Sequence, residues 1–271
     1  MPELPEVETT LRGIIPHMLH KKIKCFIIRN PNLRWPIPSE INLNMSNQII
    51  SSITRRGKYL LFETRNGYMI LHLGMSGRLH IVPTATPPKP HDHVDIILSN
   101  DLCCRYYDPR RFGCMLWTDS DPLQHKLLKK LGPEPLTEEF NTVYIYQASR
   151  ERKVGIKQFI MNSQIVVGVG NIYANEALFF AGIHPSRQAG RISYQRYEKL
   201  VAAIKQVLTL AIADGGTTLR DFFTIDGQPG YFKQSLAVYG RAEEPCVKCK
   251  RKLIQKNINQ RTTVFCSQCQ R

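Results

Sequence analysis

Four cysteines near the C-terminus constrain the fold of this chain more than any other feature. Cys246 and Cys249 form one Cys-x-x-Cys pair, and Cys266 and Cys269 form a second pair after sixteen intervening residues. Two such pairs at this separation fit tetrahedral thiolate coordination of Zn²⁺ in a two-stranded ribbon. Because four thiolates leave no position for water, we expect one structural zinc ion, which would stabilise a segment of roughly 30 residues. Two disulfides or an iron–sulfur cluster are the alternatives.

The first half of the chain has the hydrophobic pattern of short strands. A helix is expected first, over residues 5–19, with Pro5 in its first turn. Asn66-Gly67 indicates a hairpin turn, and the Pro-rich residues 83–90 are expected to form a surface loop. The predicted strands, whose spacing is typical of a β-sandwich, are Ile23–Ile28, Ile49–Arg55, Tyr59–Thr64, Tyr68–Leu73, Val94–Leu98 and Leu102–Tyr107.

The second half has the pattern of helices. From Tyr194 to Ala213, after Ser193 at the cap position, apolar residues recur with a period of about 3.6 residues, which is typical of a helix facing a core. Shorter helices are expected over Lys153–Met161 and Ile172–Ala181.

We therefore predict an α+β multidomain protein. Its first domain, residues 1–134, would be a β-sandwich with flanking helices, followed by a linker over residues 135–150. A helical domain would span residues 151–239 and include a Gly-rich loop at 215–232. Residues 240–271 would form the four-cysteine zinc ribbon, a C-terminal zinc finger.

The charge balance identifies a class of partner. Lys and Arg number 37 against 22 Asp and Glu, which gives a net charge of +15 and a pI ≈ 9.6. Such an excess favours a polyanion as the partner. A membrane surface would explain the charge equally, but no helix sets basic residues opposite an apolar face. Without a membrane-spanning run or a signal-peptide pattern, we expect a cytoplasmic protein. A ribosomal-type protein would show a similar charge.

The first residues offer reactive chemistry. Removal of Met1, which a following Pro permits, would make Pro2 a terminal secondary amine that forms an iminium on attacking an electrophilic carbon. An α-amino group titrates near pH 8, so a useful fraction is neutral at about pH 7. Glu3 and Glu6 lie within one helical turn and are able to handle protons. The alternative is a start codon followed by a Pro-capped helix.

Seven motifs, in order along the chain, resemble one family. They are Pro2-Glu3-Leu4-Pro5-Glu6-Val7-Glu8-Thr9, Arg56-Gly57-Lys58-Tyr59-Leu60, His72-Leu73-Gly74-Met75-Ser76-Gly77, His91-Asp92-His93, Asp108-Pro109-Arg110-Arg111-Phe112-Gly113, Val167-Gly168-Val169-Gly170-Asn171-Ile172-Tyr173 and the cysteine ribbon. From residue 2 to residue 269, the chain resembles the bacterial formamidopyrimidine-DNA glycosylases, which excise 8-oxoguanine. The resemblance implies a helix–two-turns–helix arrangement for the helical domain, with loop 215–232 closing on the lesion.

The resemblance also implies an activity in base-excision repair. The chain would be a monomeric bifunctional glycosylase, associated with the nucleoid, that removes oxidised purines from duplex DNA and nicks the abasic site by β,δ-elimination. Pro2 would be the nucleophile at C1′, through a Schiff-base intermediate, and Glu3 the acid that assists sugar opening. Glu6 would support that site. Lys58 would donate the proton in β-elimination, and Arg261 would serve δ-elimination and contact phosphate.

DNA contacts follow from the same resemblance, which implies them for His91, Arg110, Lys153, His72 and Asn171. A base must be turned out of the stack before excision, and side chains must fill the gap. Met75 and Phe112 suit a wedge, and Arg110 suits the orphaned base. The alternative for Met75 and Phe112 is packing in the core. The alternative for Arg110 and Arg111 is a pair of solvated side chains. The Gly-x-Gly before Asn171 fits either a phosphate-binding turn or a simple packing turn.

Two other functions are consistent with parts of the pattern. An endonuclease VIII-like glycosylase for oxidised pyrimidines is the nearer alternative, and the Leu4 context with Met75, Arg110 and Phe112 favours the purine enzyme. A non-catalytic zinc-ribbon nucleic-acid-binding protein would explain the charge and the cysteines. It would not explain the conjunction of Pro2, Glu3 and Lys58.

Overall fold

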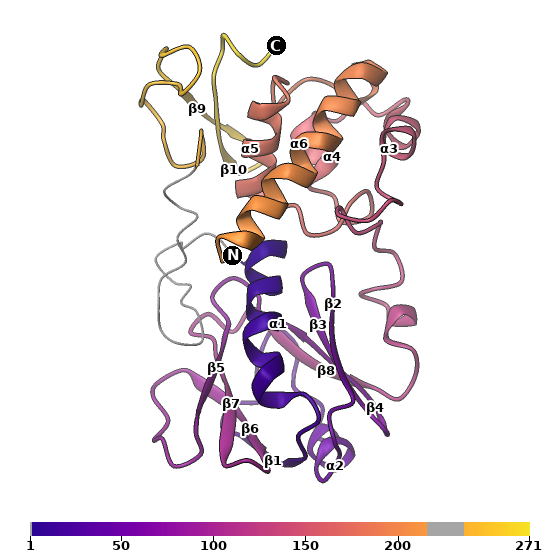
Figure 1. Ribbon diagram of the computed structural model, residues 1–271, viewed down its shortest axis with the longest axis vertical. Helices are drawn as coiled ribbons and strands as arrows, with labels where there is room; N and C mark the ends of the chain where they lie inside the picture. The colour runs from indigo at the N-terminus through magenta and orange to yellow at the C-terminus, as the bar shows by residue number, and fades with distance from the viewer. Residues whose placement is uncertain (1, 216–235) are drawn as a thin grey trace. The chain divides into compact units, whose positions relative to one another are not determined.

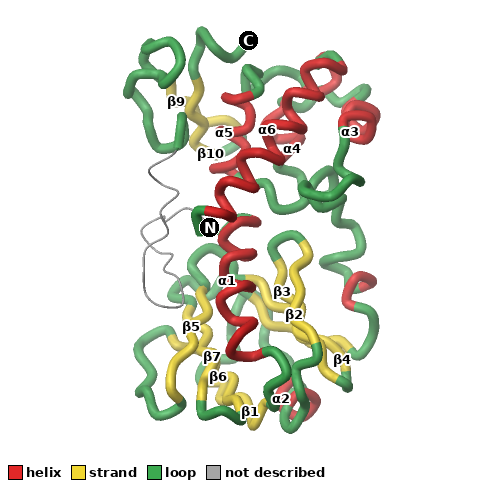
Figure 2. Tube along the Cα trace, viewed as in Figure 1, coloured by secondary structure: helices red, strands yellow, loops and turns green. Residues whose placement is uncertain are grey.

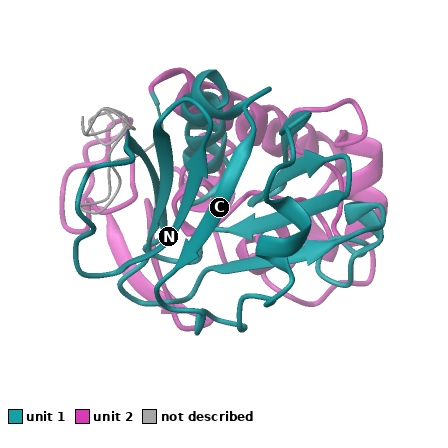
Figure 3. Ribbon diagram, turned by 90° about the horizontal axis from the view of Figure 1, so that it is seen from below, with its two compact units in different colours: residues 1–130, 215–231 teal, residues 131–214, 232–271 magenta. Residues whose placement is uncertain are grey.

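The computed structural model describes residues 2–215 and 236–271, so nearly all of the predicted loop 215–232 lies outside the described residues. The chain divides into two compact units, which Figure 3 colours separately. Among the described residues, the first unit extends to Lys130. The second runs from Leu131 to Asp214 and resumes beyond the undescribed segment.

The first unit contains two four-stranded antiparallel sheets (Figures 1 and 2). One has the strand order β1-β6-β7-β5 and the other β2-β3-β4-β8. Their bounds are β1 Ile23–Ile28, β2 Ser52–Arg56, β3 Tyr59–Thr64, β4 Gly67–His72, β5 Arg78–Pro83, β6 Asp92–Leu98, β7 Leu102–Tyr107 and β8 Cys114–Thr118. The six predicted strands are all present, while β5 and β8 were not predicted. In β5 only Leu79 is buried, so its hydrophobic signal is weak.

The two sheets share one core, which makes the first unit the predicted β-sandwich. Phe26 and Ile96 reach this core from one sheet, and Leu60 and Leu71 from the other. Helix α1 (Leu4–Met18) packs against strands of both sheets through a stripe formed by Val7, Leu11, Ile14 and Met18. A five-residue helix, α2 (Ile41–Met45), and a 3-10 turn, η1 (Pro122–Gln124), complete the unit.

The second unit is helical and ends in a two-stranded ribbon. Its elements are α3 Thr142–Ser149, α4 Ile156–Ile160, α5 Asn171–Phe180, η2 Ala189–Arg191, α6 Tyr194–Ala213, β9 Ile254–Ile258 and β10 Arg261–Phe265. Helix α6 has the predicted bounds, and α5 contacts both α6 and β10. Buried Phe179 of α5 and Val264 of β10 belong to one apolar cluster, which also includes Cys246 and Cys266.

Two helices of this unit differ from expectation. Helix α4 begins at Ile156 rather than at Lys153, because Gly155 is its N-cap and the Ile156 N–H donates to the carbonyl of Arg187. Helix α3 lies inside the stretch 135–150 that was expected to be a linker. The Asn141 side chain caps it by accepting a hydrogen bond from the Tyr144 N–H. No helix among the described residues has the length and apolar character needed to cross a bilayer.

Candidate functional site

The N-terminal motif forms the start of α1. Pro2 is buried, and Glu3 and Glu6 are only 2% and 3% exposed. Glu3 is the N-cap residue, and its N–H donates to Glu6 Oε2 at 2.8 Å within a reciprocal capping box. Pro5 occupies the first turn, where its missing N–H costs nothing. Glu6 therefore fixes the backbone next to Pro2, and two carboxyl groups lie beside the predicted nucleophile.

An ion pair ties this helix to the hairpin that carries Lys58. Glu8 accepts hydrogen bonds from Arg55 Nε at 2.8 Å and Arg12 Nε at 2.9 Å. Burial acts to raise the pKa of the Glu8 carboxyl, but the two guanidinium groups outweigh it and the pKa is lowered. Arg55 also donates to the Gly57 carbonyl at 2.9 Å. Thus α1 is attached to β2 beside the turn.

Lys58 is the second residue of a two-residue turn between β2 and β3, in which Arg56 pairs with Tyr59. The preceding Gly57 has a φ of +57°, a value that the first position of a tight hairpin demands and that glycine adopts without strain. Lys58 is half-buried at the tip of this hairpin. The sequence Arg-Gly-Lys-Tyr therefore places the lysine by turn geometry.

His72 ends β4 and lies opposite Tyr59 of β3, with the ring centroids 4.7 Å apart. Its Nδ1 accepts a hydrogen bond from the Gly74 N–H at 3.0 Å, so a neutral ring carries its proton on Nε2. Burial, followed by the charges of Lys58 and Arg34, lowers the pKa of His72 to about 4. His72 is therefore a neutral hydrogen-bond donor near neutral pH.

The three predicted wedge residues lie on two loops of the first unit. Met75 follows β4 and is 40% exposed, while Phe112 precedes β8 and is 45% exposed. The Arg110 guanidinium lies 4.7 Å from the centre of the Phe112 ring. Core packing, the alternative for Met75 and Phe112, is thereby excluded. His91 is exposed too, and its φ of +73° is a left-handed conformation that forms the turn before β6.

In the second unit, Asn171 and Arg261 both lie at strand β10. Asn171 opens α5, and its Nδ2 donates to the Thr262 carbonyl at 3.1 Å. Arg261 begins β10 and its Nη1 lies 3.7 Å from Met161 Sδ. Arg261 directly follows the turn of the ribbon hairpin, where it pairs with Ile258. Lys153 is exposed ahead of α4.

The Asn171 amide uses only part of its hydrogen-bonding capacity. Its Oδ1 is buried and has no hydrogen-bond partner among the described residues. A phosphate accepts hydrogen bonds, so the contact that the sequence implies for Asn171 would use the Nδ2 amide nitrogen of this side chain.

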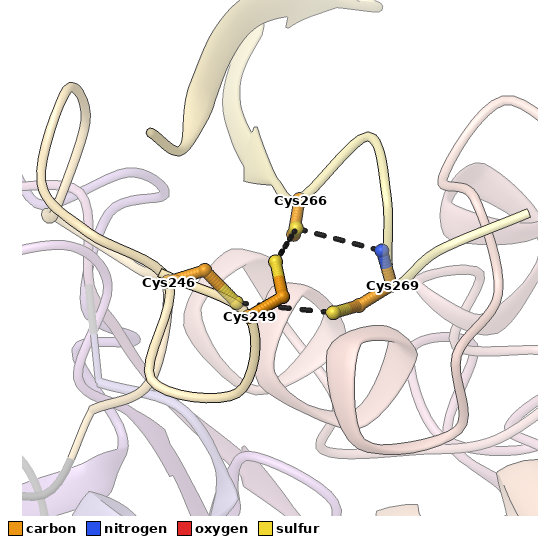
Figure 4. Close-up of side chains that lie close together, drawn as sticks. All are labelled: Cys246, Cys249, Cys266 and Cys269. Atoms are coloured by element: carbon orange, nitrogen blue, oxygen red, sulfur yellow. Dashed lines mark hydrogen bonds between the residues drawn. The ribbon is translucent and has the colours of Figure 1, made fainter. Parts of the chain in front are cut away.

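The four ribbon cysteines converge on one point (Figure 4). Their sulfur atoms all lie within 4.8 Å of one another, with 3.9 Å between Cys246 and Cys269 and 3.4 Å between Cys249 and Cys266. These separations are too long for disulfides, and all four thiols are free. A tetrahedron of thiolates around zinc, with Zn–S of about 2.3 Å, has sulfur atoms about 3.8 Å apart. The four cysteines therefore have the geometry to hold one metal ion.

Two buried charged residues of the second unit were not predicted. Glu176 of α5 accepts hydrogen bonds from the backbone N–H groups of Ala237, Val238 and Tyr239 at 2.8–2.9 Å. Burial raises the pKa of Glu176 against the effect of these bonds. Lys157 Nζ donates to Thr263 Oγ1 at 2.7 Å. Neither residue has a sequence signal, because each partner lies at least 61 positions away.

Two family models match the chain. The formamidopyrimidine-DNA glycosylase N-terminal domain matches residues 1–115, and the formamidopyrimidine-DNA glycosylase H2TH domain matches residues 131–223. A β-sandwich led by a proline-headed helix, together with a helix–two-turns–helix unit and a four-cysteine ribbon, defines a class of DNA glycosylases.

Whole-chain relatives narrow this class to one family. The formamidopyrimidine-DNA glycosylase of Saccharophagus degradans is 54% identical over 271 residues, covering 100% of both chains. A Lactococcus lactis FPG mutant in complex with Fapy-dG-containing DNA is 31% identical, with a TM-score of 0.93 and 99% of each chain covered. MutM in complex with DNA containing carbocyclic 8-oxo-G is 33% identical, with a TM-score of 0.92 and the same coverage. The chain belongs to the formamidopyrimidine-DNA glycosylase family.

Proposed function

We propose that this chain is a base-excision-repair enzyme that removes oxidised purines from duplex DNA and then cleaves the abasic strand. The observation that carries the proposal is the match to formamidopyrimidine-DNA glycosylases from end to end. Two similar structures hold DNA with Fapy-dG and with an 8-oxo-G analogue. The net charge of +15 suits a polyanionic substrate. We place the activity in the cytoplasm, on the nucleoid, and assign it to a monomer.

The proposed chemistry begins at the amine that removal of Met1 exposes. The Pro2 nitrogen attacks C1′, forming an N–C1′ bond as the glycosidic bond breaks, and the base leaves with the electron pair and a proton. Glu3 donates a proton to the ring oxygen O4′ as the sugar opens to the iminium. Its carboxyl is buried at the start of α1, next to Pro2 in the chain. Glu6 holds the backbone at this point.

Strand cleavage follows from the iminium. A proton passes from C2′ to solvent as the C3′–O bond breaks and the 3′-phosphate leaves in β-elimination. A proton then passes from C4′ to solvent as the C5′–O bond breaks and the 5′-phosphate leaves in δ-elimination. Water then hydrolyses the iminium and restores Pro2. We assign the proton donor of β-elimination to Lys58, at the hairpin tip that the Glu8–Arg55 pair attaches to α1. Arg261, exposed at the start of β10, is assigned to δ-elimination and phosphate contact.

The remaining assignments concern DNA binding. Met75 and Phe112 fill the space left by the extruded nucleotide, and Arg110 bonds the orphaned base. Four side chains contact the sugar-phosphate backbone of the DNA, namely His91, Lys153, His72 and Asn171. Of these, His72 acts as a neutral hydrogen-bond donor. In domain terms, residues 1–134 supply the chemistry, residues 135–150 connect the domains and include helix α3, residues 151–239 bind DNA and residues 240–271 are a zinc finger. We assign the metal as Zn²⁺, held by Cys246, Cys249, Cys266 and Cys269 in a structural role.

One experiment tests the proposal. The protein is incubated with an 8-oxoguanine:C duplex, a thymine-glycol duplex and undamaged DNA, each with borohydride to reduce an iminium. A covalent adduct on the first duplex alone is expected. An adduct on thymine glycol alone would instead indicate the pyrimidine enzyme, and salt-sensitive binding without any adduct would indicate a non-catalytic binder. As a control, one extra residue before Pro2 converts its nitrogen to a tertiary amide and abolishes trapping.

A further inference from the structure

A single buried carboxylate joins the two loops that carry the proposed wedge. Asp108 is completely buried at the end of β7. Its Oδ1 accepts a hydrogen bond from Ser76 Oγ at 2.6 Å. Its Oδ2 accepts two more, from the Tyr106 hydroxyl at 3.0 Å and from the Gly113 N–H at 2.9 Å. Three donors thus converge on one side chain.

Two of these donors belong to the segments that present Met75 and Phe112. Ser76 directly follows Met75, and Gly113 directly follows Phe112. The short Ser76–Asp108 bond is a charge-assisted hydrogen bond, which is roughly twice as strong as a neutral one. Asp108 therefore holds each loop at the residue next to its exposed apolar side chain.

The backbone of Asp108 extends the connection to a third predicted contact. Its N–H donates to the His91 carbonyl at 3.1 Å. Its carbonyl accepts from the Arg111 N–H at 3.1 Å and lies 2.7 Å from His93 Nε2. His91 and Arg111, which have left-handed φ values of +73° and +54°, are each held by one of these backbone bonds.

Close packing leaves the two loops little independent freedom. A Cβ placed on Gly74 would lie 2.4 Å from the carbonyl carbon of Phe112, and the φ of Gly74 is +69°. A Cβ on Gly113 would lie 1.8 Å from the Tyr106 hydroxyl oxygen. Only glycine fits at either position, because the loop backbones meet around the Asp108 carboxylate.

We propose that Asp108 is a positioning residue that fastens the Met75 loop to the Arg110–Phe112 loop, so that the three side chains enter the duplex as one preformed wedge. The proposal rests on the proposed function. Holding both loops before DNA arrives removes the entropy cost of ordering them during insertion. Asp108 acts through the three wedge residues and touches no reacting atom.

The test separates base extrusion from chemistry. Excision from an 8-oxoguanine:C duplex requires the wedge, whereas nicking at an abasic site in single-stranded DNA offers C1′ without a paired base to displace. Both rates are measured under single-turnover conditions. For Asp108→Ala, the ratio of excision to nicking is expected to fall at least about tenfold, equivalent to about 1.4 kcal/mol. The fluorescence rise of 2-aminopurine beside the lesion, which reports wedge insertion, should slow equally.

Conservative and control variants make the test specific. Asp108→Asn should retain most of the ratio, because its amide oxygen accepts from Gly113 and Tyr106 while its nitrogen donates to Ser76 Oγ. Thr64→Val removes a buried hydroxyl at the far end of β3 and should leave the ratio unchanged. If Asp108→Ala does not fold, Ser76→Ala/Tyr106→Phe removes two of the donors and carries the same expectation.

Two results would overturn the inference. One is an unchanged ratio in Asp108→Ala, or in the double variant. The other is an equal fall in both rates, which would assign Asp108 to folding or to chemistry. Inactivity of the unmodified chain on both DNAs is a separate outcome, which would reject the proposed function and the inference together.

Discussion

Asp95, a buried aspartate of strand β6, gives the most quantitative prediction. Asp95 Oδ1 accepts from Arg105 Nε at 2.8 Å, and its Oδ2 accepts from Arg105 Nη2 at 2.9 Å and from Arg29. Arg105 also donates to the carbonyls of Thr86 and Pro87, so it anchors the exposed loop that leads to His91. Replacing Asp95 with Asn keeps the shape and removes the charge.

The size of the expected change in stability follows from the pKa of Asp95. Burial acts to raise the pKa of Asp95, but the two guanidinium groups outweigh it and lower the pKa to about 2. An unfolded aspartate titrates near about 3.9, and the difference is worth about 2.6 kcal/mol at neutral pH. Because the folded pKa is the lower one, this stability is present above about pH 4 and is lost as the pH falls toward 2.

The assay compares unfolding of the wild-type chain and Asp95→Asn in urea across pH. The difference in the free energy of unfolding should be about 2.6 kcal/mol at pH 7 and about half of that near pH 3. Asp101→Asn is the matched control, since its exposed pair with Lys24 should contribute nothing measurable. An Asp95→Asn chain as stable as wild type at pH 7, or a difference that stays constant on acidification, would refute this reasoning.

Three further predictions concern Glu176, the cysteine ribbon and His72. Glu176→Gln turns an amide nitrogen toward backbone N–H donors and should cost about 1.5–3 kcal/mol in urea unfolding; an unchanged midpoint would contradict this. Cys249→Ser should reduce bound zinc well below the one ion per chain expected of the wild type by atomic absorption, and full zinc content would exclude the cysteine as a ligand. His72, with its pKa of about 4, should show no protonation by NMR between pH 5 and 8. Its contribution to the free energy of unfolding should fall as the pH drops from about 6.5 toward 4, because only the unfolded ring gains a proton there. An NMR titration midpoint near pH 6.5 would contradict this prediction.

Elements with strong periodicity were predictable from the sequence. The bounds of α6 and of β1, β3 and β7 agree with the structure, because long apolar stripes and turn residues define them locally. Helix α3 was missed because its eight residues bury only Ile145 and Ser149. Strand β5 was missed because only Leu79 of its six residues is buried, so its alternation of apolar and polar residues is weak.

The candidate site was predictable to the extent that its residues lie in local motifs. The family motifs indicated Lys58, Met75 and Phe112, and the four cysteines indicated a metal site. Asp108 and Glu176 were not recognised as important, because their function in the fold is to bind backbone and hydroxyl donors. Many of those donors are distant in sequence, such as Ser76, 32 positions before Asp108, and no spacing rule reports them.

The most direct measurement concerns the atom that becomes attached to DNA. The borohydride-reduced adduct on 8-oxoguanine:C DNA is digested with protease and nuclease, and the modified peptide is sequenced by mass spectrometry. The account predicts a chain that lacks Met1 and carries the sugar remnant on the nitrogen of Pro2. A remnant on a lysine, or on a chain that retains Met1, would contradict the claim that the buried start of α1 is the nucleophile.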